Sequence, residues 1–249
     1  MNHSVRRLNT ISEALGCKTY LEIGVATGET ILQVDVPSRT GVDPFFDFNW
    51  RQEMSNANGS LDLQQCTSDL FFSNLDPSIK YDLIFIDGLH TYEQTYRDIL
   101  NALRHSNSRT VILIDDTVPF DVFSTSRDPQ ECINLRYTCS EQREEYWQGD
   151  TYKVVPLLRL FNPHYNLATI TTDGNPQTLL WKANGVNAPD GHSIVENLAS
   201  ADYMWFLRNR GLYNMVTEKE GLERVTLSLT PTQTIWQTFS QPPGWTKRD

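Results

Sequence analysis

Short apolar runs alternate with amphipathic stretches over the first half of the chain. Residues 81–86 (YDLIFI) form the most apolar of these runs. Between the runs, apolar side chains recur three or four positions apart, which is the spacing of a helix with one buried face. The alternation predicts strands at residues 20–23, 40–42, 81–86 and 111–114, and helices at 8–15, 29–34 and 92–103, the last of them opened by a capping box of Thr91 and Gln94.

A different pattern follows in the second half. Residues 167–171 and 178–181 are strand-like, and the turn residues Asp-Gly-Asn-Pro at 173–176 separate them. Such a pair predicts a β-hairpin, and hence a strand that runs against its neighbours. Strands that alternate with helices form parallel sheets with right-handed crossovers. The sequence therefore predicts an α/β fold, in which a mostly parallel sheet has one reversed edge strand and helices on both faces.

Two stretches fall outside this pattern. Residues 117–150 have weak periodicity and are long for a connection, which is typical of a lid or an acceptor-binding loop. Further on, a linker precedes a helix predicted at residues 193–210 and capped by Ser193. We therefore expect one domain at residues 1–185 and a C-terminal helical extension with a poorly determined tail at 186–249.

Composition and charge exclude several classes of partner. The 249 residues include 31 acidic and 21 basic side chains, for a net charge of −10. Non-specific binding to nucleic acid or to an anionic membrane needs an excess of Lys and Arg, so neither partner is expected. No apolar run reaches the roughly 20 residues of a membrane span, and no secretory signal opens the chain. Four scattered cysteines favour reduced thiols in the cytoplasm.

A glycine-containing turn follows the first predicted strand. Residues 22–28 read Glu-Ile-Gly-Val-Ala-Thr-Gly. Gly24 and Gly28 allow the backbone to approach a ligand closely, and a helix N-terminus offers free N–H groups. Asp43 ends the second strand, where a carboxylate can accept hydrogen bonds from ribose hydroxyls. The turn is neither G-x-G-x-x-G nor a P-loop, which favours a nucleoside without pyrophosphate. The glycines alone serve a tight strand-to-helix turn equally well.

Acidic side chains end two of the predicted strands. Asp87 follows the third strand, and Asp115 and Asp116 follow the fourth. If these strands are neighbours, three acids converge and need protons or a cation to neutralise them. Oxygen ligands suit Mg²⁺ or another hard divalent cation, and His90 is able to accept a proton from a hydroxyl group near neutral pH. Each residue alone fits a turn or a cap equally well, but the set favours function.

The glycine turn and Asp43 resemble the first two sequence motifs of class I S-adenosylmethionine-dependent methyltransferases. Members of that family have a Rossmann-like sheet that finishes with a reversed strand. The resemblance implies that Asp43 binds the ribose of S-adenosylmethionine. For Asp69, which matches an adenine-contacting position, a turn-forming role is the alternative. The cofactor contacts implied by the resemblance are Glu22, Gly24, Gly28, Asp43, Ser68, Asp69 and Asp87.

Motifs in the second half of the predicted domain point to a particular group of methyltransferases. D-G-x-H-x-Y at residues 87–92, with the later I-D-D, resembles sugar O-methyltransferases that modify macrolide antibiotics. W-x-G-D-x-x-K at residues 147–153 is similar to a segment of bacterial relatives, and catechol O-methyltransferase has a similar layout. The resemblance covers about residues 15–185. It implies a metal site of Asp87, Asp115 and Asp116, with His90 as the catalytic base and Asp87 beside it.

The resulting hypothesis is a metal-assisted O-methyltransferase. Its expected partner is a small-molecule hydroxyl acceptor, such as a sugar or a natural-product glycoside, and an oligomer is compatible with the sequence. One alternative is a metal-independent N- or O-methyltransferase in which the acidic cluster is structural. Others are a non-catalytic S-adenosylmethionine-binding module and an oxygenase of the kind that hydroxylates antibiotics.

Overall fold

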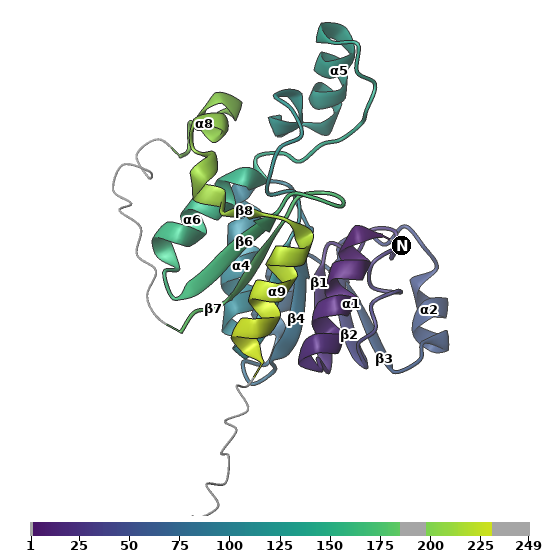
Figure 1. Cartoon of the computed structure of the whole chain (residues 1–249). Helices are drawn as coiled ribbons and strands as arrows, with labels where there is room; N and C mark the ends of the chain where they lie inside the picture. Colours follow the sequence, from purple (N-terminus) through teal and green to yellow (C-terminus); the bar gives the residue numbers. More distant parts are fainter. Residues whose placement is uncertain (1, 185–197, 231–249) are drawn as a thin grey trace, which may run out of the picture.

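One eight-stranded sheet forms the centre of the molecule (Figure 1). The computed structural model describes residues 2–184 and 198–230. The strand order across the sheet is β3-β2-β1-β4-β5-β7-β6-β8. The strands are β1 (Thr19–Ile23), β2 (Ser38–Asp43), β3 (Ser60–Gln65), β4 (Tyr81–Ile86), β5 (Ser106–Ile114), β6 (Tyr165–Ile170), β7 (Gln177–Lys182) and β8 (Met215–Val216).

Strand directions confirm the predicted α/β fold. From β3 to β5 every neighbouring pair is parallel. The β6–β7 hairpin is present, and β7 runs antiparallel to both β5 and β6. The short strand β8 pairs in parallel with β6 and lies outside the hairpin. The result is a Rossmann-like, mostly parallel sheet with one reversed strand.

Helices cover both faces of the sheet (Figure 1). Helices α1 and α9 pack against each other on one face, and α3, α4 and α6 lie on the other. The helices are α1 (His3–Leu15), α2 (Trp50–Asn56), α3 (Ser68–Asn74), α4 (Tyr92–Arg104), α5 (Pro129–Cys139), α6 (Val154–Phe161), α8 (Tyr203–Arg208) and α9 (Glu218–Leu229), with 3-10 turns at η1 (Phe123–Thr125), η2 (Thr151–Lys153) and η3 (Arg210–Tyr213). Among the residues described, no helix is apolar over a length that would cross a membrane.

Alternate side chains of the central strands enter different cores. On β4, Leu83 and Phe85 pack under α1 and α9, whereas Ile84 and Ile86 pack under α4 and α6. Both faces of the strand are therefore buried, which explains why its sequence is a continuous apolar run.

Several local predictions were wrong. Residues 29–34 form turns rather than a helix. The side chain of Thr91 makes no capping hydrogen bond; Asp150 Oδ1 instead accepts from the Tyr92 N–H at 2.9 Å. The start of the α4 helix is thus stabilised by a residue 58 positions away in the sequence, which no local pattern could indicate.

The C-terminal region also differs from its prediction. Of the predicted helix at 193–210, the described residues, from 198 onward, are α-helical only in α8 (Tyr203–Arg208), where Asp202 accepts a hydrogen bond from the Trp205 N–H at 2.7 Å and caps the helix. Ser193 lies outside the described residues. Within the predicted extension, β8 joins the sheet and α9 covers it. The described part of the extension is therefore continuous with the core, and the boundary at residue 185 stays a prediction.

Candidate functional site

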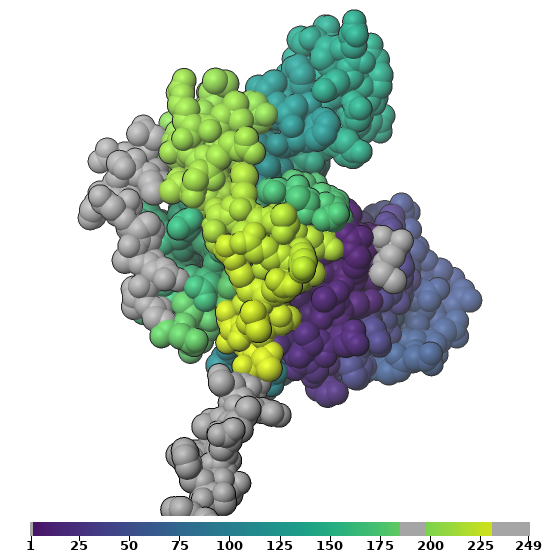
Figure 2. All heavy atoms as spheres, in the orientation of Figure 1, coloured from purple at the N-terminus to yellow at the C-terminus, as the bar shows by residue number. Residues whose placement is uncertain are grey.

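A cavity of about 1230 Å³ opens at the carboxyl ends of the central strands. Its floor includes the glycine turn after β1 and the ends of β2, β4 and β5. Its walls come from the N-terminus of α1, the β6–β7 turn and the segment that leads to and from α5. Figure 2 shows the surface hollowed between the α5 region and the body of the molecule. Ligands of open α/β sheets bind at this edge.

Both glycines of the turn are required by the packing of the chain itself. Gly24 has φ 89°, and a Cβ atom there would overlap the carbonyl oxygen of Asp87. Gly28 has φ 78°, and its Cβ would lie 2.9 Å from the ring of Phe48. These positive φ angles and close approaches exclude larger residues. The turn also lines the cavity. Its glycines can therefore serve both the packing of the chain and the binding of a ligand.

Asp43 holds the glycine turn in place. Its Oδ2 accepts from the N–H groups of Val25 and Ala26, both at 2.9 Å, and its Oδ1 accepts from the Phe45 N–H at 2.8 Å. An ionised carboxylate has about four acceptor positions. Three are filled by this chain, which leaves about one for a ligand hydroxyl.

Glu22 is buried below the turn. It is 2% exposed, and its Oε2 accepts from the Tyr20 hydroxyl at 2.6 Å. Burial, together with the carboxylates of Asp87 and Asp43, raises the pKa of Glu22 well above its usual range. The side chain is thus a candidate to face a positively charged ligand group, which would favour its ionised form.

Ser68 and Asp69 lie at the start of α3 and belong to a polar group on one cavity wall. Gln94 Nε2 donates to Ser68 Oγ at 3.2 Å and to Asp98 Oδ1 at 3.0 Å. Asp98 is 1% exposed, and burial raises its pKa to about 6. The sequence analysis missed Asp98 and assigned Gln94 to a helix cap. Their spacing of four residues on α4 was the available signal.

Three predicted residues meet where β4 and β5 end. His90 Nε2 lies 3.4 Å from Asp87 Oδ1, and His90 Nδ1 lies 3.3 Å from Asp116 Oδ2. One ligand atom from each of the three side chains lies within 4.8 Å of the others. The cavity wall also includes Trp147, whose ring stacks on that of His90 with centroids 4.7 Å apart.

The acidic cluster shifts the protonation of its own members. Burial and the neighbouring Asp115 carboxylate raise the pKa of Asp87 to about 6, and burial raises that of Asp116 to about 6. Burial alone would lower the pKa of His90, but the hydrogen bond to Asp87 and the charge of Asp116 outweigh it and raise that pKa to about 9. In this arrangement His90 is protonated at neutral pH and neutralises part of the cluster.

Asp115 lines the same cavity but is not one of these three side chains. Its Oδ1 accepts from the Asp116 N–H at 2.8 Å and from Asn175 Nδ2 at 2.5 Å. Asn175 Nδ2 also donates to Asp116 Oδ1 at 2.8 Å, which leaves Asp116 Oδ2 directed at His90. Of the three predicted metal ligands, the structure brings Asp87 and Asp116 together with His90, whereas Asp115 is hydrogen-bonded to Asn175 and to the Asp116 N–H.

Arg7 holds Asn175 over the two acids. This fully buried side chain on α1 donates to the backbone carbonyls of Thr172 and Asn175 at 2.8 and 2.7 Å, on the two sides of the β6–β7 turn. It also donates to Glu218 of α9 at 2.8 Å. The sequence analysis found neither Arg7 nor Asn175, because the contacts join parts of the chain that are far apart.

The W-x-G-D-x-x-K segment reaches the same site. Gly149 has φ 60°, and a Cβ there would overlap the backbone carbonyl of His90. Asp150 caps α4 and lies 3.3 Å from Lys153 Nζ. Gly149 therefore packs against the backbone of His90, and Asp150 holds the backbone of Tyr92 just after it. These contacts keep the segment that carries Trp147 next to the segment that carries His90.

Residues 21–117 match the model of a family described as a methyltransferase domain. This stretch runs from β1 to just beyond β5 and includes the glycine turn, Asp43 and the acidic cluster. Among curated proteins, none matches this chain.

Solved structures share the fold. The O-methyltransferase TomG from Streptomyces achromogenes, involved in tomaymycin synthesis and bound to S-adenosylmethionine, has 13% identity and a TM-score of 0.51 over 72% of this chain and 79% of that one. A putative caffeoyl-CoA O-methyltransferase from Staphylococcus aureus has 13% identity and a TM-score of 0.53 over 74% and 84%. An O-methyltransferase from Bacillus cereus, bound to S-adenosylhomocysteine, has 17% identity and a TM-score of 0.50 over 72% and 80%.

Proposed function

We propose that this chain, whose residues 21–117 match the model of a methyltransferase domain, transfers the methyl group of S-adenosylmethionine to a hydroxyl of a small molecule with the help of a divalent cation. The observation that carries the proposal is the convergence of Asp87, His90 and Asp116 in the cavity that also contains the glycine turn. A methyl donor and a hydroxyl acceptor bound in one cavity would be held in a geometry that favours transfer.

The cofactor would lie along the floor of the cavity. The glycine turn and Glu22 would face its methionine part, and the remaining acceptor position of Asp43 would bind a ribose hydroxyl. Ser68 and Asp69 would face the adenine, with Gln94 fixing the position of Ser68. These assignments are supported by their shared exposure to one cavity.

The residues around the acidic cluster fit a hard divalent cation. Three carboxylates with raised pKa values lie together at the cluster, which is the situation that a cation relieves. In addition, His90 Nδ1 is buried and makes no hydrogen bond of acceptable geometry. Asp87 and Asp116 would hold the ion, which when bound would polarise the acceptor hydroxyl. Asp115 was predicted as a ligand, and we now propose that it supports Asp116 instead.

His90 also remains the proposed base. A base must begin without its proton, whereas the two neighbouring carboxylates raise the pKa of His90 to about 9. The role therefore requires that Asp87 and Asp116 be neutralised by a charge other than that of His90. The stacked ring of Trp147 would keep the imidazole oriented while it accepts the proton of the acceptor hydroxyl.

The same pairing favours a metal-independent methyltransferase as a second candidate. His90 lies within 3.4 Å of Asp87 and within 3.3 Å of Asp116, so it can neutralise the cluster without a cation. Methyl transfer that persists in excess chelator would select this candidate. The sugar acceptor, the lid role of residues 117–150, the cytoplasmic location and an oligomeric state also remain predictions from the sequence.

Calorimetry tests the proposed cation site separately from activity. We expect Mg²⁺ to bind to the chain saturated with S-adenosylhomocysteine, and Asp116→Asn to lower that affinity by about tenfold or more because a ligand charge is lost. Asp62→Asn, on β3 and outside the cavity wall, is the matched control. Methyl transfer to a panel of hydroxyl compounds is then measured with and without chelator. Failure to bind S-adenosylhomocysteine would refute the methyltransferase proposal itself.

Asn175→Ala tests the orientation of Asp116. Loss of the amide frees Asp116 Oδ1, and partners of this kind typically contribute about 10–100-fold to metal affinity. Asp173→Asn in the same turn is the control, since the side chain of Asp173 is bonded to Thr172 and not to the acids. Equal Mg²⁺ affinity for Asn175→Ala and the control would contradict the role.

A further inference from the structure

An aromatic wall runs from the acidic cluster to the mouth of the cavity. Trp147 stacks on His90, and next to it in sequence Tyr146 packs edge-on against Phe120 with ring centroids 5.0 Å apart. Phe120 is 49% exposed and Tyr146 is 54% exposed, although both line the cavity. Large apolar side chains left open to solvent on the wall of a cavity mark a surface that binds an apolar ligand face.

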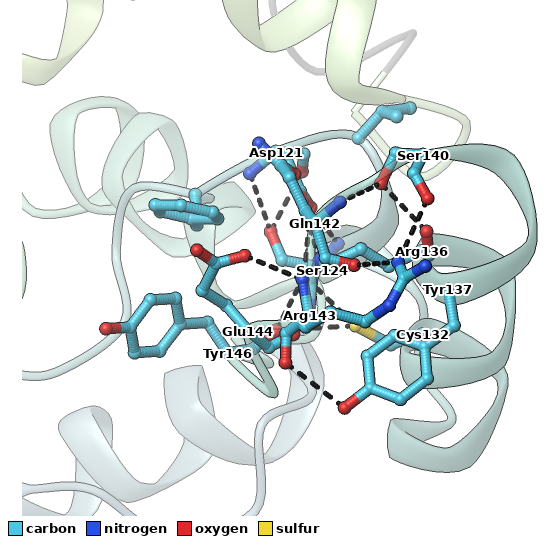
Figure 3. A network of polar contacts seen from close by, with 12 residues as sticks. Asp121, Ser124, Cys132, Arg136, Tyr137, Ser140, Gln142, Arg143, Glu144 and Tyr146 are labelled. Atoms are coloured by element: carbon cyan, nitrogen blue, oxygen red, sulfur yellow. Dashed lines mark hydrogen bonds and ion pairs between the residues drawn. The ribbon is translucent and has the colours of Figure 1, made fainter.

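The wall is set in place before any ligand binds. Arg136 of α5 is fully buried, and its guanidinium donates to Asp121 Oδ2 at 2.7 Å, to the carbonyl of Glu144 at 2.5 Å and to that of Tyr146 at 2.7 Å (Figure 3). These contacts fix Asp121, which follows Phe120, and the backbone of Tyr146 itself. A preorganised wall loses little conformational entropy when an acceptor packs on it.

The charge of the cavity limits what the acceptor can carry. Nine carboxylates line it, and among the described residues no lysine or arginine does. Phosphate and carboxylate groups of ligands are normally bound by arginine or lysine side chains, whereas here they would meet carboxylates of like charge. Glu145, which is exposed, brings negative charge to the aromatic wall. Aromatic faces attract cations. The aromatic wall and the carboxylates of the cavity therefore both favour an ammonium group on the acceptor.

From this wall and this charge we infer that the acceptor has a flat apolar ring face and a protonated amine, and that acceptors carrying phosphate or carboxylate are rejected. The inference rests on the proposed methyltransferase function, because it assigns the acceptor side of that site. An aromatic ring and the apolar face of a sugar ring both present a flat apolar surface that can pack on the aromatic wall, so the experiment includes both.

The test uses two pairs of probes that differ in charge. Dopamine is compared with 3,4-dihydroxyphenylacetate, and glucosamine with glucuronate. Binding of each to the full chain saturated with S-adenosylhomocysteine is measured by calorimetry, and methyl transfer is measured with S-adenosylmethionine. We expect the amine of at least one pair to bind about tenfold or more tightly than its anionic partner. Binding of dopamine would identify the ring of the acceptor as aromatic, and binding of glucosamine would identify it as a sugar.

Variants of the wall make the test specific. Tyr146→Ala should weaken binding of the amine about tenfold, with binding of S-adenosylhomocysteine unchanged. Glu145→Lys should reverse the preference toward the anionic probe. Leu135→Ala removes an exposed apolar side chain of α5 outside the cavity. It is the control, and it should change neither the affinity for the amine nor the preference over the anionic probe.

The outcomes separate the two proposals. Anionic probes that bind as well as the amines overturn the inference, and so does the absence of binding by all four probes to a chain that binds S-adenosylhomocysteine. An unchanged amine affinity in Tyr146→Ala also overturns it. Selective binding of an amine without methyl transfer under any condition supports the wall as a binding site and refutes the proposed function.

Discussion

Replacing Arg7 by Met should destabilise the protein far more than the same change at its neighbour Arg6. Both guanidinium groups lie 2.8 Å from the carboxylate of Glu218. Their environments differ, because the side chain of Arg7 is 0% exposed and that of Arg6 is 38% exposed. The pair of variants therefore compares a buried with a partly exposed ion pair at equal distance and with one shared partner.

The expected costs follow from burial. Removing one partner of a buried ion pair costs about 3–5 kcal/mol. Here the carbonyls of Thr172 and Asn175 lose their donor, and Glu218 keeps only its more exposed partner Arg6. An exposed pair contributes only about 0.2–1 kcal/mol. For a chain of this size, 1 kcal/mol shifts the melting temperature by about 2–4 °C. Arg7→Met should therefore lower the melting temperature by roughly 6–20 °C, and Arg6→Met by at most about 4 °C.

Denaturant and thermal unfolding of the full chain at pH 7 measure both costs. Glu218→Gln combined with Arg7→Met should cost less than the sum of the single changes, since the two side chains interact directly. Equal destabilisation by Arg6→Met and Arg7→Met would refute the reasoning from burial. A loss below about 1 kcal/mol for Arg7→Met would do the same.

Three further outcomes are expected. Gly24→Ala should unfold the chain or lower its stability severely, because the new Cβ overlaps the Asp87 carbonyl, whereas Gly211→Ala meets nothing within 4 Å and should be near neutral in thermal unfolding. Burial alone would raise the pKa of Glu218, but hydrogen bonds from two guanidinium groups outweigh it and hold that pKa below its ordinary value. The stability that wild type gains over Glu218→Gln should thus be full at neutral pH and disappear as acid titrates the carboxylate, as unfolding curves across pH will measure. Asp43→Asn should cost about 1–3 kcal/mol by losing an acceptor of backbone N–H groups, and calorimetry should show weaker binding of S-adenosylhomocysteine; unchanged affinity in a folded variant would contradict the ribose role.

The sequence by itself determined the six inner strands of the sheet and the place of the candidate site, whereas the two edge strands, β3 and β8, were not predicted. Continuous apolar runs identified the buried strands, and the residues that follow them placed Asp43, Asp87 and Asp116 at one edge. This works because strand periodicity and strand ends are local properties, and parallel strands bring their carboxyl ends together. The hairpin was equally visible, since its turn residues stand between its strands.

The tertiary structure decided which side chains meet at that edge. Adjacent residues Asp115 and Asp116 could not be distinguished from sequence, but only Asp116 faces His90, because Asn175 bonds to both acids and fixes them. Arg7, which holds the turn of Asn175, pairs with Glu218 across 211 positions of sequence. Such contacts depend on how α1, α9 and the hairpin pack on the sheet. Local propensity carries no information about that packing, since it is driven by the burial of apolar side chains. A buried charge such as Arg7 is tolerated only where the packing brings it to a partner, here one far along the chain.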